Sequence, residues 1–308
     1  MTSQTDIKYM RMALNMAQRG LGHVAPNPAV GCVLVQNDVV IATAHTARGG
    51  RPHAERVALD KAGAQAKGAT AYVSLEPCSH TGKTGPCAQA LIDAGVARVV
   101  VACGDPDPRV SGRGIEMLKA AGIDAVEGVL EAEAHALNAG FILRITENRP
   151  FITLKCAISA DGKISEAVGK RTQISGALAL RYMHLLRSYH DAILVGQMTD
   201  FVDKPKLTTR IEGYDHEALR VVLSANAGET ARDLAEQGIT RLLVKGGAKT
   251  HMSFLKTGLF DEVQLIKTPK ILGEQGVDAA DIVGVADLIL QKTRILGEDT
   301  LEIYTRKD

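Results

Sequence analysis

A histidine followed two residues later by a glutamate, His53 and Glu55, lies in a short stretch of the chain that also holds two cysteines, Cys78 and Cys87. An imidazole nitrogen and two cysteine sulfurs are common zinc ligands, and three protein ligands leave one position of a tetrahedral zinc ion open to water. Zinc in such a site lowers the pKa of its water to about 7, which makes hydroxide available at neutral pH. We therefore predict that His53, Cys78 and Cys87 hold a catalytic Zn²⁺ ion.

Glu55 follows the histidine by two residues, in the first turn of an expected helix. We expect its carboxylate to carry protons near the water and not to bind the metal. Pro52 and Pro86 directly precede the histidine and the second cysteine, and proline suits a helix start whose dipole favours thiolates. His-x-Glu followed by Pro-Cys is typical of zinc deaminases, but eight residues separate the two cysteines here instead of two.

Two plainer interpretations compete with a catalytic zinc. A histidine can cap a helix and free cysteines often pack as small core residues, which is the default when each residue is taken singly. A closed structural zinc site needs a fourth ligand, and the sequence places no further cysteine or histidine at ligand spacing. Glu55 would also serve no purpose in a closed site.

The bulk composition excludes several classes of protein. The 308 residues include 36 basic and 35 acidic side chains, so no strong field attracts nucleic acid or an anionic membrane. Aromatic residues make up 4% of the chain and tryptophan is absent, which leaves little for base stacking. The sequence shows neither a signal peptide nor a membrane span, and five cysteines do not suit a secreted disulfide framework. We expect a cytoplasmic enzyme acting on small molecules.

Hydrophobic periodicity predicts a layered α/β domain in the first half of the chain. The expected helices cover residues 6–19, 53–66, 87–94, 115–121 and 131–143, and the expected strands cover 30–35, 39–44, 69–75, 97–103 and 124–129. The first two strands suit a hairpin. The later alternation of strands with helices predicts a largely parallel sheet.

The polar stretch from Thr146 to Pro150 is the expected linker, and the α/β pattern starts again after it. The second half has expected strands over 151–159, 191–196, 219–224 and 240–247 and an expected helix over 177–189, in which Met183 and Leu186 should pack in the core. We therefore expect two three-layer α/β domains, residues 1–147 and residues 148–308. GRGIEM, which begins at Gly112, lacks the third glycine of a dinucleotide-binding fingerprint.

Four segments carry a resemblance to a known family: APNPAVGCVLV, HAE, EPCSHTGKTGPC and DPDPRVSGRG. They closely resemble the bifunctional riboflavin-biosynthesis deaminase/reductase family, whose long loop between the cysteines separates it from cytidine and tRNA-adenosine deaminases. The resemblance covers nearly the whole chain. It implies a cytidine-deaminase-like first domain and a dihydrofolate-reductase-like second domain.

The resemblance also implies the two reactions. The first half should use zinc to deaminate 2,5-diamino-6-hydroxy-4-(5-phosphoribosylamino)pyrimidine. The second half should use NADPH to reduce the ribosyl group of the aminouracil product to a ribityl chain. The implied partners are this small pyrimidine ribose phosphate and a second copy of the chain, with neither nucleic acid nor membrane.

Binding residues follow from the same resemblance. The deaminase half should hold its substrate with Asn27, His45, His80 and Lys83, although turn or surface roles also suit the first three. The reductase half should bind substrate through Arg171, Arg187, Leu207, Arg210 and Lys245. It should bind the cofactor through Lys155, Ala157, Gln173, Thr199, Asp203, Gly246 and Gly247. Arg187 and Arg210 suit a phosphate, and the glycine pair can present bare amides to another phosphate or form a plain turn.

Three positions of the second half depart from the family pattern. Lys245 stands where an acidic residue is usual, Gln173 where tryptophan is usual, and Lys204 where a second aspartate is usual. An ammonium group only donates hydrogen bonds, so it cannot replace a carboxylate that accepts them from sugar hydroxyls. The chain also reaches Glu229 almost directly after the strand at 219–224, where the family usually inserts a strand and loops.

Several alternatives remain open at this stage. The main one is an active deaminase whose second half is a weakened or inactive reductase that serves oligomerisation. A deaminase of free bases or of tRNA would explain the zinc ligands but not the second domain. A structural zinc module would bind metal without releasing ammonia from any pyrimidine.

Overall fold

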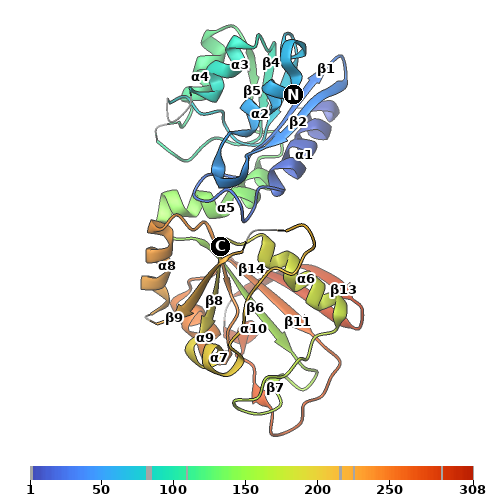
Figure 1. Cartoon of the computed structure of the whole chain (residues 1–308), viewed down its shortest axis with the longest axis vertical. Coiled ribbons are helices and arrows are strands. Elements are labelled where there is room, and N and C mark those ends of the chain that lie inside the picture. Colours follow the sequence, from blue (N-terminus) through green and yellow to red (C-terminus); the bar gives the residue numbers. More distant parts are fainter. Residues whose placement is uncertain are drawn as a thin grey trace. The chain divides into compact units, whose positions relative to one another are not determined.

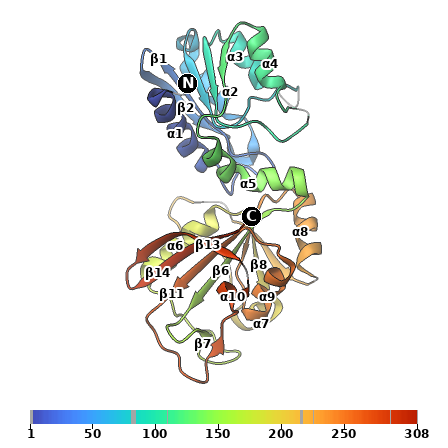
Figure 2. The ribbon, with the colours of Figure 1, turned by 180° about the vertical axis from the view of Figure 1, so that it is seen from behind.

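The computed structural model describes residues 3–80, 85–108, 110–214, 217–224, 226–285 and 287–307. The chain divides into two compact units, Met1–Glu147 and Asn148–Asp308. Each unit contains its own sheet with helices packed against it (Figures 1 and 2). Within the described ranges, none of the helices has both the length and the apolar character needed to cross a membrane.

The first unit has a five-stranded sheet in the order β2-β1-β3-β4-β5. Its strands are β1 (Gly31–Gln36), β2 (Val39–His45), β3 (Thr70–Val73), β4 (Arg98–Val101) and β5 (Asp124–Val126). β1 runs antiparallel to both β2 and β3, whereas β3, β4 and β5 are parallel. The later strands β3, β4 and β5 are thus parallel, and β1 and β2 form an antiparallel hairpin, both as predicted. The tight turn at Asn37 and Asp38, whose φ angles are 50° and 60°, reverses the chain into the predicted hairpin.

Helices complete the first unit. They are α1 (Gln4–Gln18), α2 (Ala54–Ala62), α3 (Cys87–Asp93), α4 (Arg113–Ala120) and α5 (Glu131–Glu147). α1 lies so close to β1 that a Cβ atom at Gly31 would be 1.9 Å from the Ala13 carbonyl oxygen. α2 ends at Ala62, because the next residue, Gly63, takes a φ of 51°. The predicted end lay four residues later. α5 continues through Glu147, so the first residues of the predicted linker are helical.

The second unit has a seven-stranded sheet in the order β13-β14-β11-β6-β10-β8-β9. Its strands are β6 (Phe151–Ile158), β8 (Ala192–Gly196), β9 (Leu219–Leu223), β10 (Arg241–Val244), β11 (Glu262–Lys267), β13 (Leu288–Leu296) and β14 (Asp299–Arg306). The strands from β11 to β9 are parallel, while β14 and β13 add an antiparallel hairpin at one edge. A separate two-stranded sheet pairs β7 (Lys163–Ser165) with β12 (Val277–Asp278).

Helices cover this second sheet as well. They are α6 (Ala177–Ser188), α7 (Gln197–Asp203), α8 (Ala227–Glu236), α9 (Ala248–Thr257) and α10 (Ile282–Val285). Met183 and Leu186 of α6 are buried, as predicted. The four strands predicted for this unit are all present, but the sequence analysis identified neither β11, β13 and β14 nor α7 to α10. The carboxyl ends of the parallel strands meet at one edge of the sheet, which is where ligands bind in open α/β sheets.

Candidate active sites

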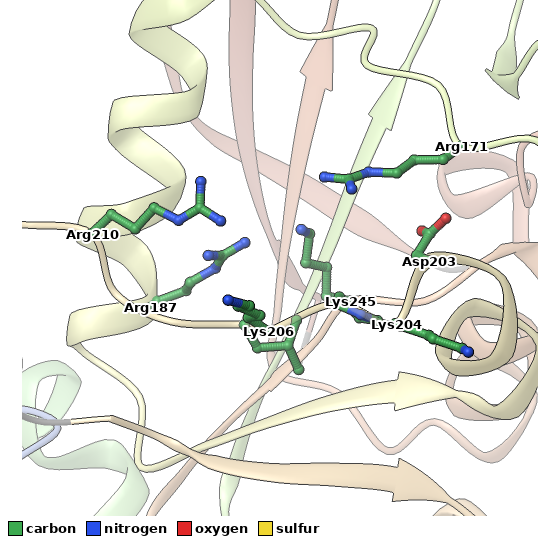
Figure 3. A pocket seen from close by; sticks show the side chains of 9 residues that line it. Arg171, Arg187, Asp203, Lys204, Lys206, Arg210 and Lys245 are labelled. Carbon is green, nitrogen blue, oxygen red and sulfur yellow. The ribbon is translucent and has the colours of Figure 1, made fainter.

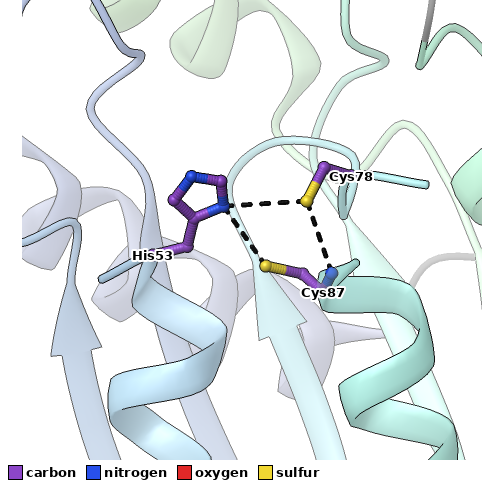
Figure 4. Close-up of side chains that lie close together, drawn as sticks. All are labelled: His53, Cys78 and Cys87. Atoms are coloured by element: carbon purple, nitrogen blue, oxygen red, sulfur yellow. Dashed lines mark hydrogen bonds between the residues drawn. The ribbon is translucent and has the colours of Figure 1, made fainter. Parts of the chain in front are cut away.

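His53, Cys78 and Cys87 converge in the first unit (Figure 4). The Nδ1 atom of His53 lies 3.3 Å from Cys87 Sγ and 3.7 Å from Cys78 Sγ. A tetrahedral zinc ion with ordinary Zn–N and Zn–S bonds holds such atoms about 3.6 Å apart. Both distances lie close to that value, so the three side chains fit a zinc ion without rearrangement.

Three local structures position these ligands. His53 has an extended backbone and is the N-cap residue of α2, whereas Cys87 is the first residue of α3 and follows Pro86. Cys78 comes from the loop after β3, and its sulfur accepts a hydrogen bond of 3.3 Å from the backbone N–H of Cys87. Two helix starts and one loop therefore face a common point, as the positions of the prolines suggest.

The two cysteine side chains shift each other's pKa in opposite directions. A hydrogen bond from the Cys87 side chain is the main cause that lowers the pKa of Cys78 to about 4. The same contact, together with burial, raises the pKa of Cys87. Zinc binding requires both cysteines to be deprotonated.

Glu55 is buried in the first turn of α2, with 3% of its surface exposed. Burial is the main cause that raises the pKa of its carboxyl to about 7. Its Oε2 atom has no hydrogen-bond partner among the residues that the structure describes. A buried carboxylate oxygen without a partner, two residues from a ligand, leaves an acceptor for a water or a substrate proton.

Glu76 is a functional candidate that the sequence analysis missed. Its buried carboxylate accepts hydrogen bonds from the backbone N–H groups of Gly112 and Gly114, each 2.9 Å long, and of Asp105, 3.3 Å long. It thereby fixes the loop that leads into α4 beside the Pro77–Cys78 segment. Burial is the main cause that raises the pKa of Asp105, on this loop, to about 6. The acidic residue directly before Pro-Cys was the available local signal.

Three of the four predicted deaminase substrate residues, Asn27, His45 and His80, belong to the described part of the chain. Asn27 packs against Gly50, where a Cβ atom would be 2.0 Å from Asn27 Nδ2, in the loop that leads to His53. His45 ends β2 and contacts the Thr46 carbonyl oxygen through Nδ1, at 2.9 Å. The Nδ1 atom of His80 is buried without a hydrogen-bond partner in the described part of the chain. Lys83 lies outside the described residues.

A cavity of about 280 Å³ forms the candidate site of the second unit (Figure 3). Its lining consists of Arg171, Arg187, Asp203, Lys204, Pro205, Lys206, Leu207, Arg210 and Lys245. All five residues predicted to bind the reductase substrate are in this set. Six of the lining side chains are cationic and one is a carboxylate, so the cavity suits an anionic ligand.

Lys155, within β6, and Lys245, directly after β10, stand side by side. Val244 pairs with Leu154 in this parallel register, which places Lys245 beside Lys155. Burial is the main cause that lowers the pKa of Lys155 to about 8 and the pKa of Lys245 to about 7. The predicted cofactor residue Ala157 lies two residues further along β6.

Three predicted cofactor residues gather at the carboxyl ends of β8 and β10. Gly247 is the N-cap residue of α9, and a Cβ atom at Gly247 would be 4.0 Å from Thr199 Oγ1. A Cβ atom at Gly246 would be 2.5 Å from the Thr250 side chain, so this position requires glycine. The pair therefore presents backbone amides at a helix start, an arrangement that binds phosphate.

Gln173 and Asp203 are the remaining predicted cofactor residues of the second unit. Gln173 belongs to the segment before α6, and its carbonyl oxygen accepts a hydrogen bond of 3.0 Å from Lys270 Nζ. Asp203, the last predicted cofactor residue, ends α7 and lines the cavity.

Comparison with known protein families gives matches in both units. Residues 3–103 match the family model described as the cytidine and deoxycytidylate deaminase zinc-binding region. Residues 150–231 and 225–301 match the RibD C-terminal domain. Each match covers one of the two candidate sites.

Relatives match over nearly the whole chain. Riboflavin biosynthesis protein RibD of Aquifex aeolicus is 36% identical over 357 aligned positions, which cover 99% of this chain and 100% of that protein. The Escherichia coli RibD protein is 36% identical over 92% of this chain and 93% of its own length. The Aquifex alignment is longer than the 308 residues of this chain, so that protein carries residues that this chain lacks.

Solved structures agree with these relatives. A structure of Acinetobacter baumannii RibD has a TM-score of 0.89 and 31% identity, and the match covers 99% of both chains. A Thermotoga maritima protein, a diaminohydroxyphosphoribosylaminopyrimidine deaminase/5-amino-6-(5-phosphoribosylamino)uracil reductase, has a TM-score of 0.88 and 30% identity over 98% of this chain and 99% of its own.

These findings confirm the predicted fold class, a cytidine-deaminase-like domain followed by a dihydrofolate-reductase-like domain. They also confirm zinc and NADPH as the cofactors, and they give no support to a second half that has lost its activity. The chain belongs to the RibD family of riboflavin biosynthesis proteins, which join a zinc-dependent deaminase to an NADPH-dependent reductase.

Proposed function

We propose that residues 1–147 deaminate 2,5-diamino-6-hydroxy-4-(5-phosphoribosylamino)pyrimidine and that residues 148–308 reduce the ribosyl group of the resulting aminouracil to ribityl. The similarity to the Thermotoga deaminase/reductase supports this choice of substrate. The observation that carries the first reaction is the zinc-sized cluster of His53, Cys78 and Cys87 beside the buried Glu55.

His53, Cys78 and Cys87 hold the zinc ion in the deaminase site. Zinc supplies a positive centre and, from water, a nucleophile at neutral pH. Glu55 protonates the ring nitrogen of the pyrimidine and later the leaving amine, because its buried carboxyl lies two residues from the ligand His53 and its Oε2 atom has no partner among the described residues. Asn27, His45, His80 and Lys83 hold the pyrimidine and its ribose phosphate.

The reductase site separates phosphate binding from cofactor binding. Arg187 and Arg210 hold the substrate phosphate at one side of the cavity, with Arg171, Leu207 and Lys245 around the rest of the substrate. Arg187 is itself held in place, because its Nη1 atom donates a hydrogen bond of 2.7 Å to the Thr208 carbonyl oxygen. The cofactor residues are those predicted above: Lys155, Ala157, Gln173, Thr199, Asp203, Gly246 and Gly247. NADPH supplies the hydride.

One assay tests both reactions. The phosphoribosylaminopyrimidine is added to zinc-loaded protein with NADPH, and ammonia and NADPH absorbance are followed in the same tube. We expect ammonia first and NADPH oxidation after it. Zinc binding without ammonia would identify a structural zinc module, and ammonia without NADPH oxidation would identify a silent second half.

We also infer that the protein works in the cytoplasm and as a homo-oligomer. Cysteine ligands stay available for zinc in a reducing compartment. β13 is an edge strand that exposes Ile289, Leu290 and Ile295, which suits contact with a second copy. Sedimentation equilibrium of the full chain measures the oligomeric state, and a monomer at micromolar concentration would contradict the second inference.

A further inference from the structure

Lys245 lies between the two groups of residues to which the substrate phosphate and the cofactor are assigned. On the basis of the reductase function proposed above, we propose that Lys245 donates the proton that opens the ribose ring during the reduction. The positive charge of Lys155, its neighbour on β6, helps Lys245 to release this proton.

The geometry places the Lys245 amine within the cavity. Figure 3 shows its side chain between the paired guanidinium groups of Arg187 and Arg210 on one side and Arg171 on the other. Lys245 also directly precedes Gly246, at the helix start assigned to the cofactor. A sugar whose phosphate lies on the arginine pair and whose reacting carbon faces the cofactor must therefore pass Lys245. Lys155 is not among the residues that line the described cavity.

The surroundings of Lys245 make its ammonium group acidic. The largest charge effects on it come from Lys155 of β6, Arg187 of α6, Arg171 before α6, and Asp203 at the end of α7. His184 of α6 also interacts with it electrostatically. Burial and the three cations lower the pKa of Lys245, and the single carboxylate opposes them, with a result of about 7. Lys206 and Arg210 add further positive charge to the lining. A buried lysine next to other cations can exchange its proton at neutral pH.

The reduction consumes one proton as well as a hydride. Lys245 gives a proton to the ring oxygen of the ribose, and the bond between that oxygen and C1 breaks with its electron pair going to oxygen. The lone pair of the attached nitrogen forms a C=N double bond. Hydride from NADPH then adds to C1 and returns the pair to nitrogen, which leaves an open ribityl chain, NADP⁺ and a neutral lysine that regains its proton from water.

Binding of the substrate phosphate should favour the protonated form of Lys245. A phosphate held by Arg187 and Arg210 places negative charge in the cavity, and negative charge nearby raises the pKa of a lysine. Lys245 should therefore take up a proton when the phosphate binds at a pH just above 7. This proton uptake can be measured without any turnover.

The main test replaces Lys245 by arginine in the full-length protein, since arginine keeps the positive charge but does not release a proton near neutrality. With the deaminated substrate, we expect K245R to lower kcat for NADPH oxidation about 100-fold while KM changes little. For wild-type protein, kcat/KM should fall as the pH rises above 7, and K245R should lack this fall. Lys256→Arg, an exposed lysine in the last turn of α9, is the matched control and should keep wild-type kinetics.

Calorimetry supplies the second measurement. Inorganic phosphate is titrated into each protein at pH 7.5 in two buffers of different ionisation enthalpy. Wild-type protein should take up protons on binding, and K245R should bind phosphate with much less uptake, which also shows that the variant is folded.

The outcomes separate this role from the reductase function itself. Wild-type kcat in K245R, or a change confined to KM, would overturn the role of Lys245 while leaving the reductase function in place. Equal proton uptake in both proteins would overturn it as well. Wild-type protein that oxidises no NADPH would instead overturn the proposed reductase function, and the role of Lys245 with it.

Discussion

Gly114 lies so close to Pro77 that a Cβ atom on the glycine would be 2.0 Å from the Pro77 carbonyl oxygen. Pro77 directly precedes the zinc ligand Cys78, so Gly114→Ala should displace that ligand. We expect the variant to bind less zinc per chain and to release ammonia at least about 10-fold more slowly, since small displacements at a catalytic site have large effects on rate. Metal analysis and an ammonia assay check this. Gly228→Ala, where φ is not positive and a Cβ atom would come no closer than 3.4 Å to another residue, controls for the loss of a glycine as such.

Glu55→Gln should retain zinc and lose deamination by about 1,000-fold or more, because the amide cannot carry protons in either step. Zinc content and ammonia release are the two measurements. Glu116→Gln, an exposed position on α4, is the matched control. Turnover retained in the Glu55 variant would show that another group moves the protons.

Removal of zinc should separate the two activities. A chelator should abolish ammonia release, whereas NADPH oxidation with the deaminated intermediate should continue, because the reductase cavity lies wholly within residues 148–308. Added zinc should restore ammonia release. A parallel loss of NADPH oxidation would show that the second unit depends on the metal.

Arg210→Met should weaken binding of the phosphorylated reductase substrate. A hydrogen bond to a charged group contributes about 1.5–3 kcal/mol, so KM should rise by about 10- to 100-fold. The dephosphorylated riboside should bind equally weakly to both proteins, which tests the phosphate contact itself. Arg232→Met on the exposed side of α8 should leave KM unchanged.

The first unit should lose stability in acid through Asp6. Its hydrogen bond from Arg98, 2.6 Å long, is the main cause that lowers the pKa of the buried Asp6 carboxyl from 3.8 to about 2. A carboxyl whose pKa is lower in the folded than in the unfolded state stabilises the fold at pH values above its unfolded-state pKa. This stabilisation is therefore fully present above pH 3.8 and is lost as the pH falls toward 2. Asp6→Asn should lower the free energy of unfolding at pH 7 by about 2 kcal/mol. Urea unfolding at pH 7 and pH 3 measures this, with the exposed Asp60→Asn as control.

The zinc cluster could be predicted because its ligands occupy a short segment with a defined pattern. His53 and Glu55 share one helix start, and proline marks the start that carries Cys87. Glu76 gave no comparable signal. Its partners are backbone N–H groups 29 to 38 residues away, so its burial depends on tertiary structure that local spacing does not record.

The second unit was harder to predict. Its cavity combines side chains from α6, from the ends of α7 and β10, and from loops, so spacing alone could not gather Arg187, Asp203 and Lys245. The resemblance to a known family supplied those assignments. β13 escaped prediction because none of its residues is fully buried and its sequence, LILQKTRIL, shows no alternation of apolar with polar positions.

The boundary between Glu147 and Asn148 has a consequence for how the two reactions can be organised. Each unit closes its own core, and the polypeptide crosses from one to the other once. A gene split at this codon should yield two separately expressed polypeptides. Mixing them would then show whether covalent linkage speeds the overall conversion or only keeps the two enzymes at equal abundance.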